Sequence, residues 1–305
     1  MLDTFFSQGS TMLMQLGQYW IPIAFISAFF FGVQHLLAKK AMQGVGDWTG
    51  GALWLIVAAI ILGPLALIQP VTDIPWYFWP TLLLRSSLEV VGLTLYLRAH
   101  RSGDISLVTP ILNLSPVLVL GTSALIASEF PSTIALVGCV VVSVGAYWLG
   151  MVGAKTLDPL SPFRLMRDNK PMRQMLIATI AWSFTTSLHS VAIAATNVYF
   201  YAGIGTIMLA FFFVAGAVAF ERKEFVDRLK KLDVLKPVGL GLINAFGFVS
   251  MLIAQSGGAD SSVQSIKHLS IVIAAIGAWF AFKEPVAKRI APIIVMVVGA
   301  ILVSL

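Results

Sequence analysis

The sequence has 305 residues, of which 58% are hydrophobic and only 11% are charged. A soluble globular domain carries about 25% charged residues, so this chain lacks the polar surface that would cover a water-soluble body. We therefore predict an integral membrane protein. The formal charge of +6 then reports orientation in the membrane rather than nucleic-acid binding. The single cysteine excludes a disulfide framework and a cysteine-rich metal site, and the four scattered histidines have no metal-binding spacing. No cofactor is expected.

A membrane-spanning helix needs about 20 mostly apolar residues. Barrel strands need only about 9–11 alternating residues, so the length of the apolar segments predicts an all-α protein. The ten predicted spans lie at residues 20–38, 48–68, 77–97, 105–128, 132–150, 174–195, 201–220, 236–255, 261–282 and 286–305. Residues 221–236 form a charged connection, which is predicted either as a solvated cytoplasmic loop or as an amphipathic segment on the membrane surface.

Basic residues divide sharply between the two sides of this arrangement. The loops after the first, third, fifth, seventh and ninth spans, counted with the first few residues of the span that follows, hold 18 of the 20 lysines and arginines, while the opposite loops and both termini hold none. The other two, Arg85 and Lys267, lie within spans. Under the positive-inside rule the basic side is cytoplasmic, so both termini are predicted to be non-cytoplasmic. The expected location is the inner (plasma) membrane of a bacterium, with several passes.

The two halves of the chain are similar at an offset of 155 residues. Residues 105–129 match residues 261–284 at several positions, including Leu114 with Leu269, Ser115 with Ser270, and Glu129 with Glu284. Each copy has five spans. Because this number is odd, the second copy must insert upside down relative to the first, as in many secondary transporters. The predicted organisation is an N-terminal segment (1–19), a first five-helix repeat (20–150), a basic cytoplasmic linker (151–173) and a second, inverted five-helix repeat (174–305).

The motifs SEFPS after the fourth span and FKEP after the ninth, with the glycine-rich fifth and tenth spans VGCVVVSVGAYWLG and APIIVMVVGAILVSL, resemble the drug/metabolite transporter superfamily. The likeness is to its ten-helix form with two EamA-type repeats, and it implies transport of a small molecule. Residues 265–272, SIKHLSIV, resemble the ninth helix of the sugar-phosphate and triose-phosphate branch, where a Lys-Arg pair holds the phosphate. Lys267 matches that lysine and His268 replaces the arginine. Family members are usually drawn with cytoplasmic termini, whereas the charges here predict the reverse.

Polar residues inside the spans are the candidate substrate-binding residues. Arg85 and Glu89 are four residues apart and share a helix face, either as site groups or as a neutralised structural pair. Glu89 can also carry a proton, since burial favours a protonated carboxyl. Lys267 either binds an anionic group of the substrate or extends its side chain to the outer interface. The other candidates are His268, Asn113, and two repeat-related sets, Gln34 with His189 and Glu89 with Asn244. These polar groups line a shared cavity or make ordinary hydrogen bonds between helices.

The leading hypothesis is a secondary transporter that moves a small polar, anionic metabolite by alternating access, coupled to protons or to exchange. No G-x-x-x-x-G-K-[ST] motif is present. The first alternative is an exporter of amino acids or other neutral or amphipathic metabolites. A second is an intramembrane enzyme acting on lipid head groups. The sequence contains no catalytic motif for such an enzyme, so no enzyme is predicted. A third, a membrane scaffold, leaves the buried charges unexplained. The expected partners are a small-molecule substrate and the lipid bilayer, without nucleic acid; a homodimer stays open.

Overall fold

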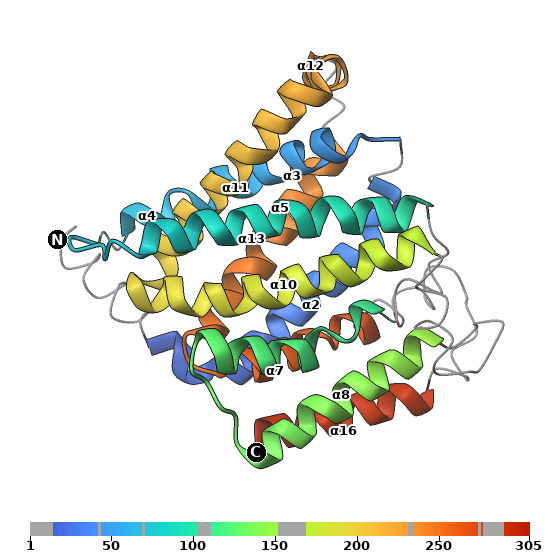
Figure 1. Ribbon diagram of the computed structural model, residues 1–305. Helices are drawn as coiled ribbons and strands as arrows, with labels where there is room; N and C mark the ends of the chain where they lie inside the picture. Colours follow the sequence, from blue (N-terminus) through green and yellow to red (C-terminus); the bar gives the residue numbers. More distant parts are fainter. Residues whose placement is uncertain are drawn as a thin grey trace. The chain divides into compact units, whose positions relative to one another are not determined.

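The computed structural model describes residues 15–41, 44–68, 71–102, 111–151, 169–230, 235–273, 276 and 290–305. Within these ranges the regular structure is helical and contains no strand (Figure 1). Each of the ten predicted spans contains a helix. The all-α prediction is therefore confirmed for this part of the chain.

The helices of the first half follow the predicted apolar segments. They are η1 (Gln15–Tyr19), α2 (Trp20–Ala41), α3 (Asp47–Leu62), α4 (Leu65–Ile68), α5 (Phe78–Ser102), α7 (Ser115–Ile126) and α8 (Thr133–Met151). Those of the second half are α10 (Lys170–Ala195), α11 (Val198–Phe220), α12 (Arg222–Lys230), α13 (Leu235–Gln255), α14 (Asp260–Lys267) and α16 (Ile290–Ser304).

Five of the described helical segments are long and apolar enough to cross a membrane. They are Leu16–His35, Asp47–Ile68, Lys170–Ala195, Val198–Phe220 and Val238–Gln255. Three shorter apolar helices are Ser115–Ile126, Thr133–Leu149 and Ile290–Ser304. Length and composition thus favour several membrane crossings.

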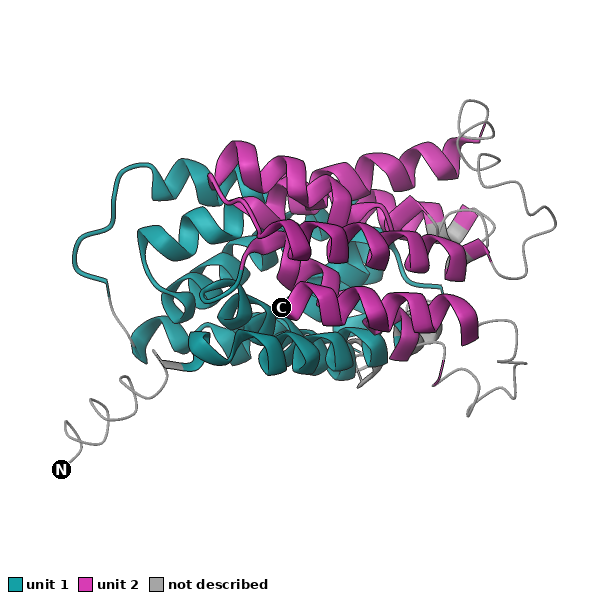
Figure 2. Cartoon of the chain, turned by 90° about the horizontal axis from the view of Figure 1, so that it is seen from below, with its two compact units in different colours: residues 1–86, 188–258 teal, residues 87–187, 259–305 magenta. Residues whose placement is uncertain are grey.

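The chain divides into two compact units that cut across the predicted repeats. Unit 1 comprises residues 1–86 and 188–258, and unit 2 comprises residues 87–187 and 259–305 (Figure 2, teal and magenta). The chain passes from one unit to the other within α5 and again within α10. Each unit therefore contains helices from both halves of the sequence.

Unit 1 is built from α2 packed against α13 and from α3 packed against both α11 and α13. Small residues allow the close approaches. The hydroxyl of Ser27 on α2 donates a hydrogen bond to the carbonyl of Gly247 on α13 at 3.0 Å. A Cβ at Gly203 of α11 would lie 2.9 Å from the carbonyl oxygen of Gly63. These helices therefore meet through their backbones.

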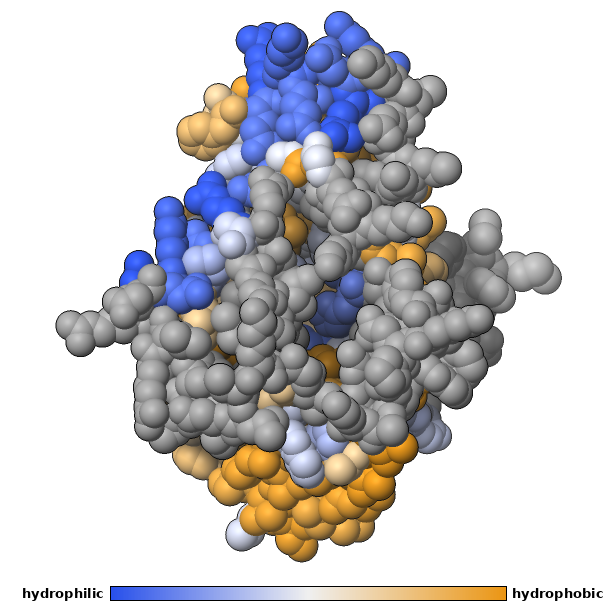
Figure 3. Space-filling model, turned by 90° about the vertical axis from the view of Figure 1, so that its right-hand side faces the viewer, coloured by the Kyte–Doolittle hydropathy of each residue, from blue (hydrophilic) through white to orange (hydrophobic). Residues whose placement is uncertain are grey.

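Unit 2 contains an equally close pair, α8 against α16. A Cβ at Gly138 of α8 would lie only 2.6 Å from the backbone nitrogen of Val303, and a Cβ at Gly299 would lie 2.6 Å from that of Val142. The outer surfaces of the pair are apolar and account for the orange area at the bottom of Figure 3. Its exposed side chains include Ile134, Val137 and Val144 on α8 and Ile294, Val298 and Ile301 on α16. Such a surface suits contact with lipid.

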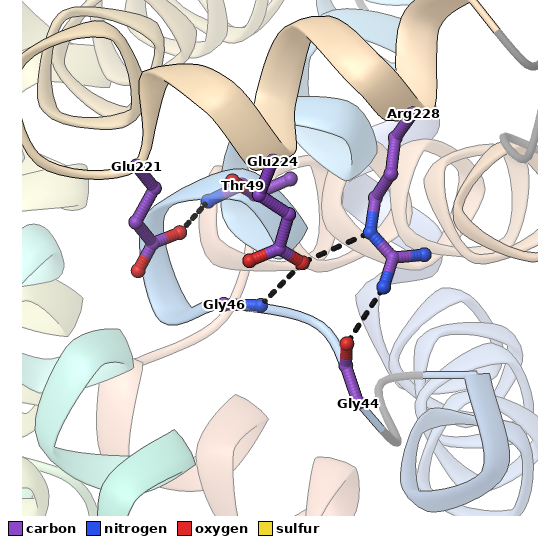
Figure 4. Close-up of polar contacts among 6 residues, drawn as sticks. All are labelled: Gly44, Gly46, Thr49, Glu221, Glu224 and Arg228. Carbon is purple, nitrogen blue, oxygen red and sulfur yellow. Dashed lines mark hydrogen bonds and ion pairs between the residues drawn. The ribbon is translucent and has the colours of Figure 1, made fainter.

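Helix α12 lies in the charged connection after α11 and caps the start of α3 (Figure 4). Gly46, the N-cap residue of α3, offers no side-chain cap. Instead, Glu221 accepts a hydrogen bond from the backbone N–H of Thr49 at 2.8 Å, and Glu224 accepts one from that of Gly46 at 3.1 Å. Carboxylates are favourable there because the N-terminus of a helix carries a partial positive charge.

Arg228 completes this contact, which we call the α12 clasp (Glu221, Glu224 and Arg228). Its Nε donates to Glu224 at 2.9 Å, and its Nη2 donates to the carbonyl of Gly44 at 2.6 Å. The hydrophilic surface at the top of Figure 3 lies over α12. The loops after the first and seventh spans, which the charge pattern assigns to one side of the membrane, therefore meet in unit 1.

Candidate functional site

Two helical segments of unit 2 are broken at positions 155 residues apart. In the predicted span 105–128, a turn at Asn113 and Leu114 precedes α7. In the predicted span 261–282, α14 ends at Lys267 and a turn at His268 and Leu269 precedes further helical residues. Asn113 and His268 are equivalent in the two repeats, so the breaks are equivalent too.

The two breaks have the same hydrogen-bond geometry. The N–H of Leu114 donates to the carbonyl of Ile111 at 3.1 Å, and the N–H of Leu269 donates to that of Ile266 at 2.9 Å. Both bonds reach back three residues rather than four, which tightens the chain locally. Discontinuous helices at corresponding positions of inverted repeats are typical of substrate sites in transporters.

Only one of the breaks has a local cause in the sequence. Pro116, in the first turn of α7, has no N–H to donate to the carbonyl of Leu112, and its ring disfavours a continuous helix. The equivalent residue in the second repeat is Ile271, whose N–H donates to the carbonyl of His268 at 3.1 Å. The second break therefore forms without a proline.

Polar side chains connect the two broken segments. The side-chain amide of Gln264 on α14 donates to the hydroxyl of Ser115 on α7 at 3.0 Å, and its nitrogen lies 3.5 Å from Nε2 of His268. Asn113 is fully buried and donates to the carbonyl of Ala146 at 2.6 Å. Its Oδ1 has no hydrogen-bond partner among the described residues. A buried acceptor without a partner is rare and favours a ligand or a water there.

Lys267 is the charged residue at the break in the second repeat. It is half-buried at the end of α14, where the partial negative charge of a helix C-terminus favours a cation. Glu89 on α5 attracts it electrostatically. The carboxylate of Glu89 also accepts a hydrogen bond from Nε1 of Trp182 on α10 at 3.1 Å.

The indole of Trp182 has a fixed place in unit 2. A Cβ at Gly92 of α5 would lie 2.7 Å from its Nε1, so only glycine leaves room for the ring. The ring of Tyr96 lies 5.2 Å from it, centre to centre. Trp182 therefore positions the carboxylate of Glu89, the acid that acts on Lys267.

The other four predicted residues lie in unit 1. Nδ2 of Asn244 on α13 donates to Oε1 of Gln34 on α2 at 3.5 Å. Nη1 of Arg85 on α5 donates to the carbonyl of Gly205 at 3.5 Å. Nδ1 of His189 on α10 lies 2.5 Å from the hydroxyl of Tyr201.

One aromatic ring joins two of these residues. The guanidinium carbon of Arg85 lies 5.5 Å from the centre of the Phe248 ring, and the imidazole of His189 lies at 5.5 Å from the same ring in an edge-to-face arrangement. Arg85, His189 and Tyr201 are all buried. Unit 1 thus holds a separate cluster, which we call the Arg85 cluster (Arg85, His189, Tyr201 and Phe248).

The structure thus divides the eight predicted site residues into two groups of four. Unit 2 holds Glu89, Asn113, Lys267 and His268, and unit 1 holds Gln34, Arg85, His189 and Asn244. Arg85 and Glu89 each have contacts within their own unit, and their mutual pairing stays a prediction.

Sequence reasoning missed several contributors. Gln264, Trp182, Tyr201 and Phe248 were not among the predicted site residues. Gln264 could have been found, because it lies one helical turn before His268 and therefore shares its face. The two aromatic residues beside Arg85 and the tryptophan beside Glu89 could not, because an apolar span contains many similar rings.

Apolar helices, two inverted repeats and equivalent helix breaks define a class of membrane protein, namely carriers that are built from two copies of one unit. The EamA-like transporter family matches residues 18–151 and again residues 172–305. The chain therefore belongs to this family and contains two EamA domains. It is a multi-pass membrane transporter of a small-molecule substrate and not an enzyme, and the predicted resemblance to EamA-type transporters is confirmed.

A solved structure described as "Crystal structure of protein" has a similar fold. It superposes with a TM-score of 0.70 at 15% sequence identity and covers 94% of this chain and 98% of its own. At this identity the likeness concerns the fold alone. No curated protein matches this chain in sequence.

Proposed function

We propose that this EamA transporter carries a small anionic metabolite by alternating access and binds it at the two helix breaks of unit 2. The observation that supports this most is the equivalence of the breaks at Asn113 and His268. The first offers an amide, and the second offers a lysine and an imidazole. The coupling is to protons or to exchange, as no motif for nucleotide hydrolysis is present.

The charge at the second break favours an anion. Lys267 is attracted electrostatically by Glu89, and a bound carboxylate or phosphate would add charge-assisted hydrogen bonds to the same ammonium group. Lys267 would hold the anionic group, with His268 as a second donor when it is protonated. The free Oδ1 of Asn113 would accept a hydrogen bond from a hydroxyl of the same solute.

Transport in proteoliposomes tests this proposal. Purified protein is screened with labelled carboxylates and phosphate esters, and with neutral amino acids as the alternative class. Lys267→Gln should raise the KM of the anionic substrate by about tenfold or more, because a hydrogen bond to a charged group is lost. Lys267→Arg should partly restore the affinity. Lys223→Gln, at an exposed lysine of α12, is the matched control and should leave transport unchanged.

Two results would contradict the proposal. One is an unchanged KM in Lys267→Gln. The other is a substrate that proves to be cationic. A neutral amphipathic substrate whose affinity does not depend on Lys267 would instead support the alternative exporter.

We also propose that both termini face away from the cytoplasm of a bacterial cell. The division of the basic residues supports this, and the α12 clasp agrees with it because it joins two loops assigned to the basic side. Single cysteines near each terminus, in a Cys139→Ser background, should react with an impermeant reagent in intact cells. Labelling only after lysis would reverse the orientation. A homodimer stays a prediction, to be tested by the mass of the purified protein.

A further inference from the structure

Arg85 is a buried cation whose described contacts are neutral. Arg85 is only 2% exposed. It lies about two turns after the start of α5. Its guanidinium makes a long hydrogen bond to the carbonyl of Gly205 and lies over the ring of Phe248. Its Nε has no hydrogen-bond partner among the described residues. A desolvated guanidinium requires compensation.

The acids of unit 1 do not provide this compensation. In the part of unit 1 that the structure describes, every acid lies at a helix terminus, in a connection or on α12, namely Asp47, Asp73, Glu221, Glu224 and Asp227. Two of them belong to the α12 clasp. Glu89 comes one turn after Arg85 on α5, in unit 2, where its carboxylate accepts the hydrogen bond of Trp182 and attracts Lys267.

The Arg85 cluster leaves the Nε donor of the guanidinium without a partner among the described residues. The ring of Phe248 interacts with the guanidinium as a cation–π partner and does not use its N–H groups. His189 and Tyr201, which bond each other, add two polar groups within the same cluster. An arginine with a stacked face and an unused Nε donor suits a small anion.

We propose that unit 1 contains an anion-binding site of its own, centred on Arg85, which takes a small monovalent anion such as a halide or a carboxylate. This inference goes beyond the proposed function, because it concerns a different unit and does not depend on which solute binds at Lys267. The bound anion neutralises the guanidinium and so stabilises the contacts of Arg85 with Gly205 on α11 and with Phe248 on α13.

Thermal unfolding of the purified full-length protein tests the site, with chloride as the probe. Chloride replaces a bulky organic sulfonate at constant ionic strength, which separates specific binding from screening. A ligand that binds only the folded state raises the apparent stability in a saturable way. We expect this behaviour in the wild type, an apparent affinity weakened by about tenfold or more in Arg85→Gln, and no change in the control Lys223→Gln, at an exposed lysine of α12. Acetate, tested in the same way, shows whether carboxylates share the site.

Phe248→Leu is the second variant, which tests the site if Arg85→Gln does not fold. It keeps the charge but removes the ring, and it should weaken the apparent affinity for chloride by about two- to fivefold, in keeping with a cation–π contact of about 0.5–1 kcal/mol. The proposal is wrong if the wild type shows no saturable effect, or if the effect is the same in both variants. It is also wrong if chloride acts only in Glu89→Gln, since Glu89 then neutralises Arg85. An unaffected Lys267→Gln in the transport assay would contradict the proposed function and leave this site standing.

Discussion

The two units handle interruptions of their helices differently. In unit 1, α2, α11 and α13 run without a break, and the interruption between α3 and α4 coincides with Pro64 and occurs in one repeat only. In unit 2, the breaks at Asn113 and His268 occur in both repeats, and the second has no proline. An interruption in one copy is explained by its own residues, whereas a matched pair indicates a requirement that both copies share.

The cations of the two units also have different surroundings. The buried cation of unit 1, Arg85, contacts a carbonyl and an aromatic ring. The cation of unit 2, Lys267, is half-buried at a helix end and is attracted by Glu89. Unit 2 therefore combines a broken backbone, a cation and an acid in one place, which is the combination expected where a charged solute and a proton are exchanged.

The largest expected effect is on stability and compares the helix packing of the two units. Gly138→Ala places a Cβ at 2.6 Å from the backbone of Val303 in unit 2, and overpacking of this kind costs about 1–3 kcal/mol. Gly247→Ala in unit 1 meets Cβ of Phe30 at 3.1 Å, which requires a smaller displacement than the contact at Gly138, so its loss of stability should be smaller. Thermal unfolding measures both.

Gly121→Ala is the matched control, because nothing lies within 4 Å of its added Cβ. It should be neutral or should stabilise α7 by about 0.5–1 kcal/mol, the helix preference of alanine over glycine. An equal loss for all three variants would show that close packing of α8 and α16 is not the cause.

The next effect concerns the α12 clasp of unit 1. The double change Glu221→Gln and Glu224→Gln removes the charges that cap α3, and losing a cap costs about 0.5–2 kcal/mol. We expect a lower unfolding temperature and faster hydrogen exchange in the first turn of α3. Asp227→Asn, at an exposed residue of the same helix, should change neither. Faster exchange in that control as well would indicate a general charge effect.

A smaller effect should follow from Pro116→Ala, which tests the origin of the breaks in unit 2. Since the second repeat breaks at His268 without a proline, we expect the turn at Asn113 to persist. The transport rate should change by no more than about threefold, which corresponds to a free-energy change below about 1 kcal/mol. A structure of the variant shows the turn directly. A continuous helix through residue 113 with unchanged transport would show that the breaks are not part of the site.

The smallest effect is a pH dependence at Glu129, which lies between α7 and α8 in unit 2. Burial raises the pKa of this carboxyl, opposed by its hydrogen bond from the backbone N–H of Asp260 at 2.9 Å. Because the folded pKa is the higher one, the contribution of Glu129 is present below the unfolded pKa and is lost as the pH rises through the folded pKa. Stability measured from about pH 4 to about pH 8 should therefore fall less steeply in Glu129→Gln.

Asp73→Asn, in an exposed connection of unit 1, provides the comparison for this titration. It should follow the wild-type curve. A Glu129→Gln curve that is parallel to the wild type would mean that Glu129 titrates in the folded protein as it does in the unfolded one.

The sequence by itself determined the membrane character, the helical spans and the two copies of one unit. These depend on composition, on the length of apolar runs and on short motifs, all of which are local properties. It also selected the polar residues within the spans, because few charges and amides occur there. Pro116 even marked one of the two breaks.

Only the tertiary structure decided how these parts combine. The division into units that each draw helices from both repeats, the break at His268, and the different contacts of Arg85 and Glu89 have no local signal. Each depends on which helices pack together, and apolar helix surfaces are too similar in sequence to specify their partners. The contacts of Glu89 with Trp182 and of Arg85 with Phe248 follow from that packing alone.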